Sequence, residues 1–176
     1  MIVVAIVGIL AVLGVYGVRK YIASAKSAEA RASLGSIAKD EAVAYERDSM
    51  ASSVLAATTS ASNSRRMCPS ATATVPASAT SVQGRKYQST PADWNTDAAA
   101  NAGFACLKFS MDQPQYYVYS YSVTGSGSAV GNSFVAAAQG DLNGDGVLSL
   151  FQITGAIAAG YVLNIAPNML EVRPEE

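Results

Sequence analysis

The chain has 176 residues, half of them hydrophobic, and a formal net charge of −1 at pH 7. That charge gives no electrostatic basis for binding nucleic acid, and the length allows one domain with an appendage. The sequence contains no histidine, which excludes the commonest general base and the commonest metal ligand. It also lacks a phosphate-binding glycine loop and a Cys-X-X-Cys pair, so we expect a protein without enzymatic activity.

The chain opens with an uncharged run, MIVVAIVGILAVLGVYGV, that ends at Arg19. As a helix, residues 1–18 would be about 27 Å long, close to the hydrocarbon thickness of a bilayer. A core helix of a soluble protein is the alternative, but such a run needs a large apolar interior. β-Branched residues interspersed with glycines favour packing between helices as well as contact with lipid.

Residues 21–50 carry regularly spread charges, no proline and a single glycine. Their apolar residues recur at steps of three and four, which is typical of an amphipathic helix. We therefore predict one long helix over residues 1–50, apolar over 1–18 and amphipathic over 19–50. About fifty residues are too many for a globular core, so half of this helix must project from the domain. The apolar stripe consists of Ala30, Leu34, Ile37, Ala38 and Tyr45.

The stretch MIVVAIVGILAVL resembles the N-terminal helix of type IV pilins, in particular type IVa major pilins, and of their pseudopilin relatives. The resemblance covers roughly the first thirty residues. Segments 94–104 and 116–121 match more loosely. The resemblance implies an α+β fold: a long N-terminal helix packs its C-terminal half on an antiparallel sheet, and its N-terminal half forms the core of a helical filament. The residues assigned in this way to the assembly helix are Ile2, Val3, Val4, Ile6, Val7, Gly8, Ile9, Leu10 and Leu13.

The resemblance also implies a function, that of a structural subunit polymerising into a type IV pilus that supports motility and adhesion. The implied partners are identical subunits in a helical polymer, the inner membrane before assembly, and the pilus assembly machinery. The head would lie in the periplasm before assembly and on the cell surface afterwards, and methylation would accompany membership of this family. A minor pilin or type II secretion pseudopilin is the alternative within the family. A membrane-anchored calcium- or ligand-binding module is the alternative of another class.

Two departures from the family pattern concern the N-terminal helix. The leader, its cleavage site and the acidic residue near the mature N-terminus of the family would all lie upstream of Met1. We therefore expect either that the numbering begins inside the mature protein or that the gene product lacks them.

The family usually has a proline where Tyr16 stands, in a region where the helix can unwind in filaments. Gly14 and Gly17 flank Tyr16, and each glycine weakens a helix by about 1 kcal/mol. We predict that this pair softens the helix in place of the proline; a continuous helix is the alternative.

Residues 51–92 are rich in serine, threonine and alanine, with interruptions at Pro76 and Gly84. This composition is typical of a long exposed loop with little regular structure, here part of a globular head of residues 51–176. O-glycosylation of its hydroxyl groups is one interpretation, and an unmodified polar loop is the other. In an exported protein the even cysteine count indicates one disulfide, between Cys68 in this loop and Cys106.

An antiparallel sheet is predicted over residues 104–165. Its first clear strand is residues 104–110, which includes Cys106. The next is the alternating aromatic and β-branched run at 116–123, which a Gly-Ser-Gly-Ser turn follows. Several short strands after one long helix indicate the α+β class. The predicted strands are residues 104–110, 116–123, 134–139, 148–154 and 161–165.

The stretch DLNGDGVLS follows the opening of a calcium loop, whose first, third and fifth positions supply converging oxygens. The glutamate expected at the twelfth position is Gln152, so the bidentate carboxylate is missing. We expect either weak calcium binding, with an affinity of about millimolar, or a plain turn built on Asn-Gly and Asp-Gly. No other cofactor is required. The candidate calcium ligands are Asp141, Asn143, Asp145, Val147 and Ser149.

Overall fold

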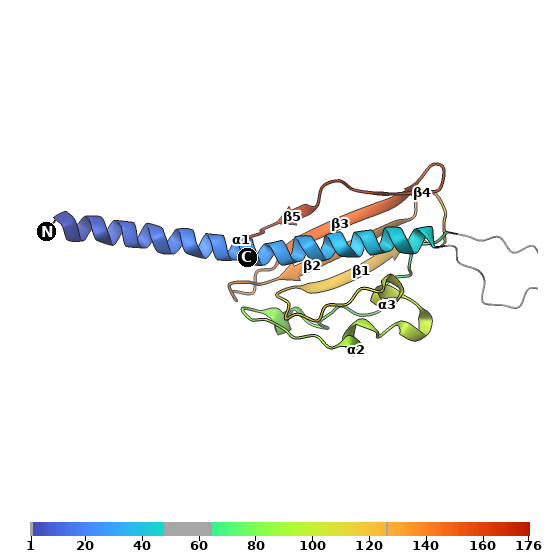
Figure 1. Ribbon diagram of the computed structural model, residues 1–176, viewed down its shortest axis with the longest axis horizontal. Helices are drawn as coiled ribbons and strands as arrows, with labels where there is room; N and C mark the ends of the chain where they lie inside the picture. The colour runs from blue at the N-terminus through green and yellow to red at the C-terminus, as the bar shows by residue number, and fades with distance from the viewer. Residues whose placement is uncertain (1, 48–64, 126) are drawn as a thin grey trace, which may run out of the picture.

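The computed structural model describes residues 2–47, 65–125 and 127–176. A single long helix, α1 (Ile2–Glu46), carries a head at its C-terminal half, and its N-terminal half projects away from that head (Figure 1). Together with a five-stranded antiparallel sheet this confirms the predicted α+β class. The helix is continuous through Gly14 and Gly17, so softening of this segment in a polymer stays a prediction. Residues 48–50 of the predicted helix lie outside the described residues.

The sheet has the strand order β1-β2-β3-β4, and β5 also pairs with β3. β4 covers the end of one edge of β3 and β5 covers its beginning, because Gly155 pairs with Ile165 and Gln152 with Leu170. The predicted strands at 116–123, 134–139, 148–154 and 161–165 correspond to the first four, whereas β5 was not predicted. Ser126, in the predicted turn after β1, lies outside the described residues. The strands are β1 (Val118–Thr124), β2 (Ser133–Gly140), β3 (Ser149–Ala158), β4 (Val162–Ile165) and β5 (Leu170–Val172).

The predicted strand at residues 104–110 is wrong, because Gly103–Leu107 form the short helix α3. Phe104 and Leu107 lie three residues apart and are both buried, a spacing that places them on one side of a helical turn. Phe104 also packs edge-on against Trp94, with 5.0 Å between the ring centroids. The sheet therefore begins at β1 and extends to β5. The other short helices are α2 (Pro91–Trp94) and the 3-10 turns Ala79–Val82 and Ala98–Ala100.

The part of the predicted loop that the structure describes, residues 65–92, has little regular structure but is not exposed throughout. Val75 pairs with Tyr119 of β1 through two backbone hydrogen bonds of 3.0 and 2.8 Å, so this segment covers the free edge of β1. Residues 51–64, with seven of the fifteen serine and threonine residues of the predicted loop, lie outside the described residues. The buried apolar residues of 65–92 are Met67, Cys68, Val75 and Val82.

The C-terminal half of α1 lies on one face of the sheet (Figure 1). All five residues of the predicted apolar stripe are buried, which confirms the amphipathic pattern. Ala136 and Ala138 of β2 are buried on that face, and such small side chains leave room for the large ones beside them. Burial of each large aliphatic side chain contributes about 1.5–3 kcal/mol. The buried residues of α1 are Ser27, Ala30, Ser33, Leu34, Ile37, Ala38, Glu41, Ala44 and Tyr45.

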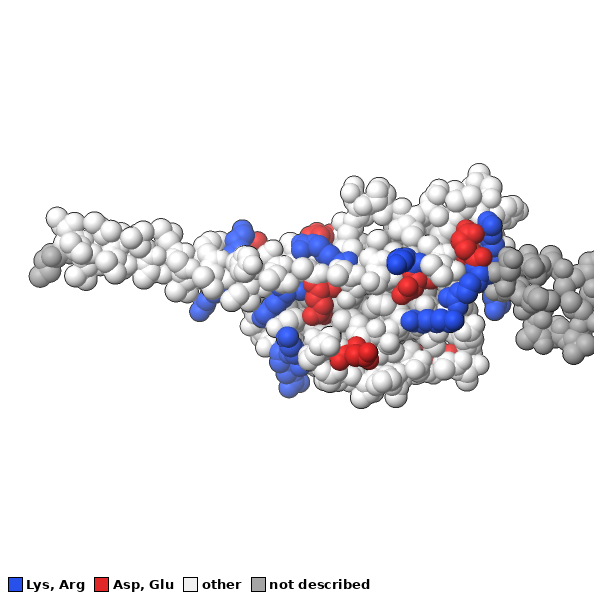
Figure 2. Space-filling view, viewed as in Figure 1, with Lys and Arg blue, Asp and Glu red and all other residues white. Residues whose placement is uncertain are grey.

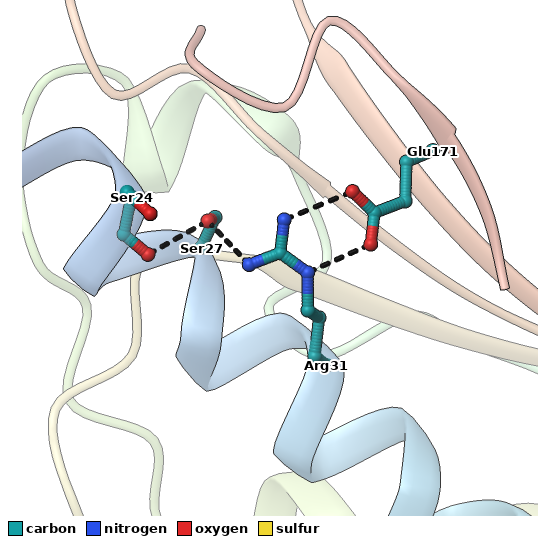
Figure 3. A network of polar contacts seen from close by, with 4 residues as sticks. All are labelled: Ser24, Ser27, Arg31 and Glu171. Atoms are coloured by element: carbon teal, nitrogen blue, oxygen red, sulfur yellow. Dashed lines mark hydrogen bonds and ion pairs between the residues drawn. The ribbon is translucent and has the colours of Figure 1, made fainter. Parts of the chain in front are cut away.

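A polar network fastens β5 to α1 (Figure 3). Arg31 donates from Nε and Nη2 to the two carboxylate oxygens of Glu171, at 2.7 and 2.9 Å. Its Nη1 donates to Ser27 Oγ at 2.9 Å, and this hydroxyl donates to the Ser24 carbonyl. The guanidinium carbon lies 5.4 Å from the ring centroid of Phe151. One arginine on the helix therefore holds the last strand and a core aromatic ring.

Replacing Arg31 by lysine should lower the free energy of unfolding by about 0.5–1 kcal/mol, because lysine cannot reproduce the two parallel hydrogen bonds. The estimate is small because the Arg31 and Glu171 side chains are 40% and 31% exposed. The Arg31 guanidinium lowers the pKa of Glu171. The stabilisation from the Arg31–Glu171 ion pair is therefore present above the ordinary glutamate pKa, and it is lost as pH falls through the lowered pKa of Glu171. Urea unfolding at neutral and acid pH would check this, and equal stability of both proteins at every pH would contradict it.

Candidate functional site

The N-terminal half of α1 is a largely apolar surface that no other described part of the chain covers. Every side chain from residue 2 to residue 22 is exposed, including Ile2 at 78%, Val4 at 74% and Leu10 at 61%. A stretch of 18 residues in α1 is strongly apolar and has no buried residue. Figure 2 shows the outer part of this projecting half without charged side chains and the first cations where it approaches the head, whereas charges of both signs are spread over the head. The segment is long and apolar enough to cross a membrane and is compatible with membrane anchoring.

The glycines of α1 pack against no other part of the described chain. A Cβ atom added at Gly8, Gly14, Gly17 or Gly35 would meet no other atom within 4 Å, apart from neighbouring backbone of the helix. Each of these glycines nevertheless costs about 1 kcal/mol of helix stability relative to alanine. Small residues allow two helices to approach closely. The four glycines therefore favour packing against a helix outside the described chain.

A face of small residues continues beyond the apolar segment, on the side of α1 that is turned away from the sheet. Ala25, Ala28, Ala32 and Gly35 are all exposed and follow one another at steps of three and four. These residues lie on the half of α1 that the head already holds in place. The surface available for helix packing is therefore longer than a membrane anchor alone requires.

The predicted disulfide between Cys68 and Cys106 is confirmed, with a distance of 5.7 Å between the Cα atoms. It joins the irregular segment before β1 to α3. The Cys68 backbone is also held from two other directions, since its N–H donates to the Glu41 carboxylate and its carbonyl accepts from Tyr121 Oη at 3.1 Å. One residue thus connects α1, α3 and β1.

Glu41 is a fully buried acid within the apolar face of α1. Its two carboxylate oxygens accept the Cys68 N–H at 3.3 and 3.4 Å. Burial raises the pKa of Glu41 to about 7, although the polar Tyr121 hydroxyl, the hydrogen bond from Cys68 and the charge of Arg47 oppose this shift. The sequence analysis missed Glu41 as a buried residue, even though it continues the spacing of the apolar stripe.

Glu41 should make the head less stable as pH rises. The fold favours the protonated carboxyl of Glu41, because the pKa of this group is higher in the folded chain than its ordinary value of 4.5. The resulting stabilisation is complete below pH 4.5 and is lost as pH rises to about 7. We expect the free energy of unfolding to fall by on the order of 3 kcal/mol over this window because of this one group. Glu41→Gln keeps an oxygen acceptor for Cys68 but has no proton to lose, so it should remove that part of the pH dependence.

The measurement is urea unfolding at a series of pH values between the ordinary pKa of Glu41, 4.5, and its raised pKa of about 7. Glu46→Gln is the matched control, because Glu46 lies on the same helix with an exposed side chain. Since other groups titrate as well, the informative quantity is the difference in slope between each variant and the original chain. A slope in Glu41→Gln equal to that of the control would contradict the assignment.

In the Asp141–Ser149 segment, the carboxylate and amide side chains accept hydrogen bonds from backbone N–H groups of the same segment. Asp141 is buried, and its two carboxylate oxygens accept the N–H groups of Gly144 and Gly146 at 2.6 and 2.8 Å. Asn143 Oδ1 accepts the Asp145 N–H at 2.9 Å, and Asp145 Oδ1 accepts the Val147 N–H at 2.7 Å. These bonds form a tight turn between β2 and β3.

Ser149, the last candidate calcium ligand, and Gln152 lie in β3, outside this turn. Ser149 Oγ donates to the Gly140 carbonyl at 2.8 Å and so belongs to the beginning of β3. Gln152, which stands at the glutamate position of a calcium loop, lies in β3 opposite Ala137. Among residues 2–47, 65–125 and 127–176, no group of three or more His, Cys, Asp or Glu side chains is arranged to hold a metal. The geometry is that of a turn, and calcium binding stays a prediction.

No protein-family model, curated protein or solved structure matches this chain. The resemblance noted in the sequence therefore stands beside a long apolar N-terminal helix, an antiparallel sheet and a disulfide, an arrangement consistent with a pilin fold.

Proposed function

We propose that this chain is a structural subunit of a type IV pilus on the bacterial surface, without catalytic activity. The observation that carries the proposal is the exposed apolar half of α1, which continues without a break into the half that packs on the sheet. Each large aliphatic side chain there gains about 1.5–3 kcal/mol on leaving water. The proposal gives this surface two apolar environments in succession, namely the inner membrane before assembly and the helices of neighbouring subunits afterwards.

Two features of α1 favour a polymer over a simple anchor. A lipid-embedded anchor gains nothing from glycines whose surroundings in the chain are empty, whereas close helix packing requires small residues. The exposed small face formed by Ala25, Ala28, Ala32 and Gly35 extends past the apolar segment, where lipid would not reach. In the proposed filament this packing is heterologous, and it propagates because the rotation from one subunit to the next does not close a ring.

The partners in this proposal are identical subunits, the inner membrane and the pilus assembly machinery. The head would lie in the periplasm before assembly and outside the cell afterwards. A minor pilin or a secretion pseudopilin would use the same helix in a shorter polymer. We propose no required cofactor, because the Asp141 carboxylate already accepts the N–H groups of its own turn. Assembly that stops on calcium chelation would contradict this last point and favour the calcium-binding alternative.

The test is to shear the source cells, collect the released material and identify its dominant protein by intact mass. Thin filaments made mainly of this chain would support the major-subunit proposal. A chain that stays in the envelope, with no filament containing it, would contradict that proposal. Removing residues 2–18 provides the control, because the truncated head should be released in soluble form and should not assemble.

A further inference from the structure

A groove lies where α1 leaves the head. It has a volume of about 580 Å³, and α1 contributes Tyr16, Arg19, Lys20 and Lys26 to its lining. The opposite wall comes from parts of the chain that are distant in sequence, namely Leu142 of the turn after β2 and Glu175 near the C-terminal end. The groove is therefore built by tertiary structure and is not a property of the helix alone.

Cations outnumber carboxylates in the lining of this groove, and the lining residue Asn143 also donates to the Glu176 carboxylate. Its lining has three cations and one carboxylate, and the carboxylate of Glu175 lies 3.2 Å from Lys20 Nζ. Arg19 has no ion-pair partner among the described residues. Lys26 Nζ lies 4.8 Å from the ring centroid of Tyr116, and Lys86 Nζ lies at the same distance from that ring. Two ammonium groups sharing one aromatic ring leave the charge of Lys26 available to an anion.

The groove also lies at a defined height relative to the apolar segment. Arg19 follows directly after the uncharged residues 2–18, which span about 25 Å as a helix. Side chains on a helix lean toward its N-terminus, which favours contact of Lys20 and Lys26 with groups near the end of the apolar segment. Tyr16 is one turn before the first charge, the level at which aromatic side chains meet lipid headgroups. When residues 2–18 lie in a bilayer, the cations of the groove are at its headgroup layer.

We propose that this groove binds the headgroup of an anionic phospholipid in the leaflet that faces the head. The phosphate would lie among Arg19, Lys20 and Lys26, and the acyl chains would run along the apolar residues of α1. Leu142 supplies an apolar wall for the glycerol backbone. The inference rests on the membrane-resident stage of the proposed function. In this proposal Arg19, Lys20 and Lys26 contact a lipid phosphate, a contact that a membrane helix without cations at its end would not make.

The test uses the full chain in a neutral detergent, titrated with phosphatidylglycerol or with phosphatidylcholine carrying the same acyl chains. Native mass spectrometry then counts the bound lipids. Each cation near an anionic surface is worth about fivefold in affinity, so we expect a preference of about tenfold or more for phosphatidylglycerol in the first binding step. Equal binding of the two lipids would overturn the proposal.

Two pairs of substitutions locate the effect. Arg19→Gln with Lys26→Gln should remove most of the preference for phosphatidylglycerol. Lys39→Gln with Lys108→Gln removes the same charge from exposed positions elsewhere on the head and should leave the preference unchanged. If both pairs lowered the preference equally, the groove would have no special role and the proposal would be wrong.

A gain of binding provides a check that misfolding cannot imitate. Glu175→Gln releases Lys20 from its ion pair and should raise the affinity for phosphatidylglycerol by a few fold. Unchanged or weaker binding would count against the proposal. Soluble glycerol phosphate should not displace the lipid at equal concentration, because it lacks the acyl chains. Displacement at that concentration would identify a site for a soluble anion and overturn the assignment to lipid.

The outcome is separable from that of the proposed function. Filaments without any preference for phosphatidylglycerol would contradict the lipid site and leave the pilus proposal standing. A clear preference in a chain that never polymerises would support the lipid site and contradict the pilus proposal.

Discussion

Replacing Gly8 by leucine is expected to abolish filament formation and to leave the chain inserted in the membrane. Leucine is strongly apolar and lowers the cost of insertion slightly, by about 0.3–0.6 kcal/mol. Within the described part of the chain the new side chain has room, since a Cβ at Gly8 meets no atom within 4 Å apart from neighbouring backbone of the helix. Between closely packed helices, however, the added volume would cost about 1–3 kcal/mol at each contact. That cost repeats for every subunit of a polymer.

The measurement compares the yield of sheared filaments with the amount of chain in the membrane fraction. Ile9→Leu is the matched control, because it changes the shape of a neighbouring side chain and keeps its volume. Gly35→Ala separates folding from assembly, since it should stabilise the isolated head by about 1 kcal/mol through helix propensity alone. Normal filament yield from the Gly8→Leu variant would contradict the packing role of this glycine.

Replacing both Cys68 and Cys106 by alanine should lower the free energy of unfolding of the head by about 4 kcal/mol. The two cysteines are 38 residues apart, so the disulfide removes considerable freedom from the unfolded chain. The unfolded state without it would be less compact, and the dependence of stability on urea should become steeper. Urea unfolding of the two proteins under oxidising conditions would measure both effects.

This substitution should also act on Glu41, because Cys68 donates its N–H to that carboxylate. Without the disulfide, the segment that covers Glu41 is less constrained, and the carboxylate gains contact with water. The raised pKa of Glu41 would then move back toward its ordinary value, and the fall in stability with rising pH would shrink. An unchanged pH slope, or a loss of stability well below 2 kcal/mol, would contradict this account of Cys68.

The helix and most of the sheet could be predicted because their signals are local. The three- and four-residue spacing of Ala30, Leu34, Ile37 and Tyr45 is set by helix geometry, and each of these residues is buried. The alternation in residues 116–123 indicated β1 for the same reason, since strand geometry has a period of two.

The elements that were missed depend on tertiary contacts. The residues of α3 include aromatic and apolar side chains that suit a strand, but the contact with Trp94 and the disulfide place them in a helical turn. β5 has only three residues, and its pairing with β3 and the Arg31–Glu171 contact hold it in place. No local pattern indicates either result.

The candidate site likewise has a part that the sequence predicts and a part that depends on tertiary contacts. The apolar residues of the assembly helix are evident from the sequence, because a run without charge needs no tertiary information to identify. The groove around Arg19 and Lys20 needs Leu142 and Glu175, which only the fold brings to the helix. The buried position of Glu41 likewise depends on the segment around Cys68 that covers it.

The central claim is that the exposed half of α1 is the packing core of a polymer. Electron cryomicroscopy of the sheared surface fraction tests it most directly. We expect helical filaments built from this chain, with residues 2–22 of α1 packed against the same residues of neighbouring subunits and the heads outside. Filaments in which these residues face solvent, or a chain present only as separate molecules in the membrane, would contradict it.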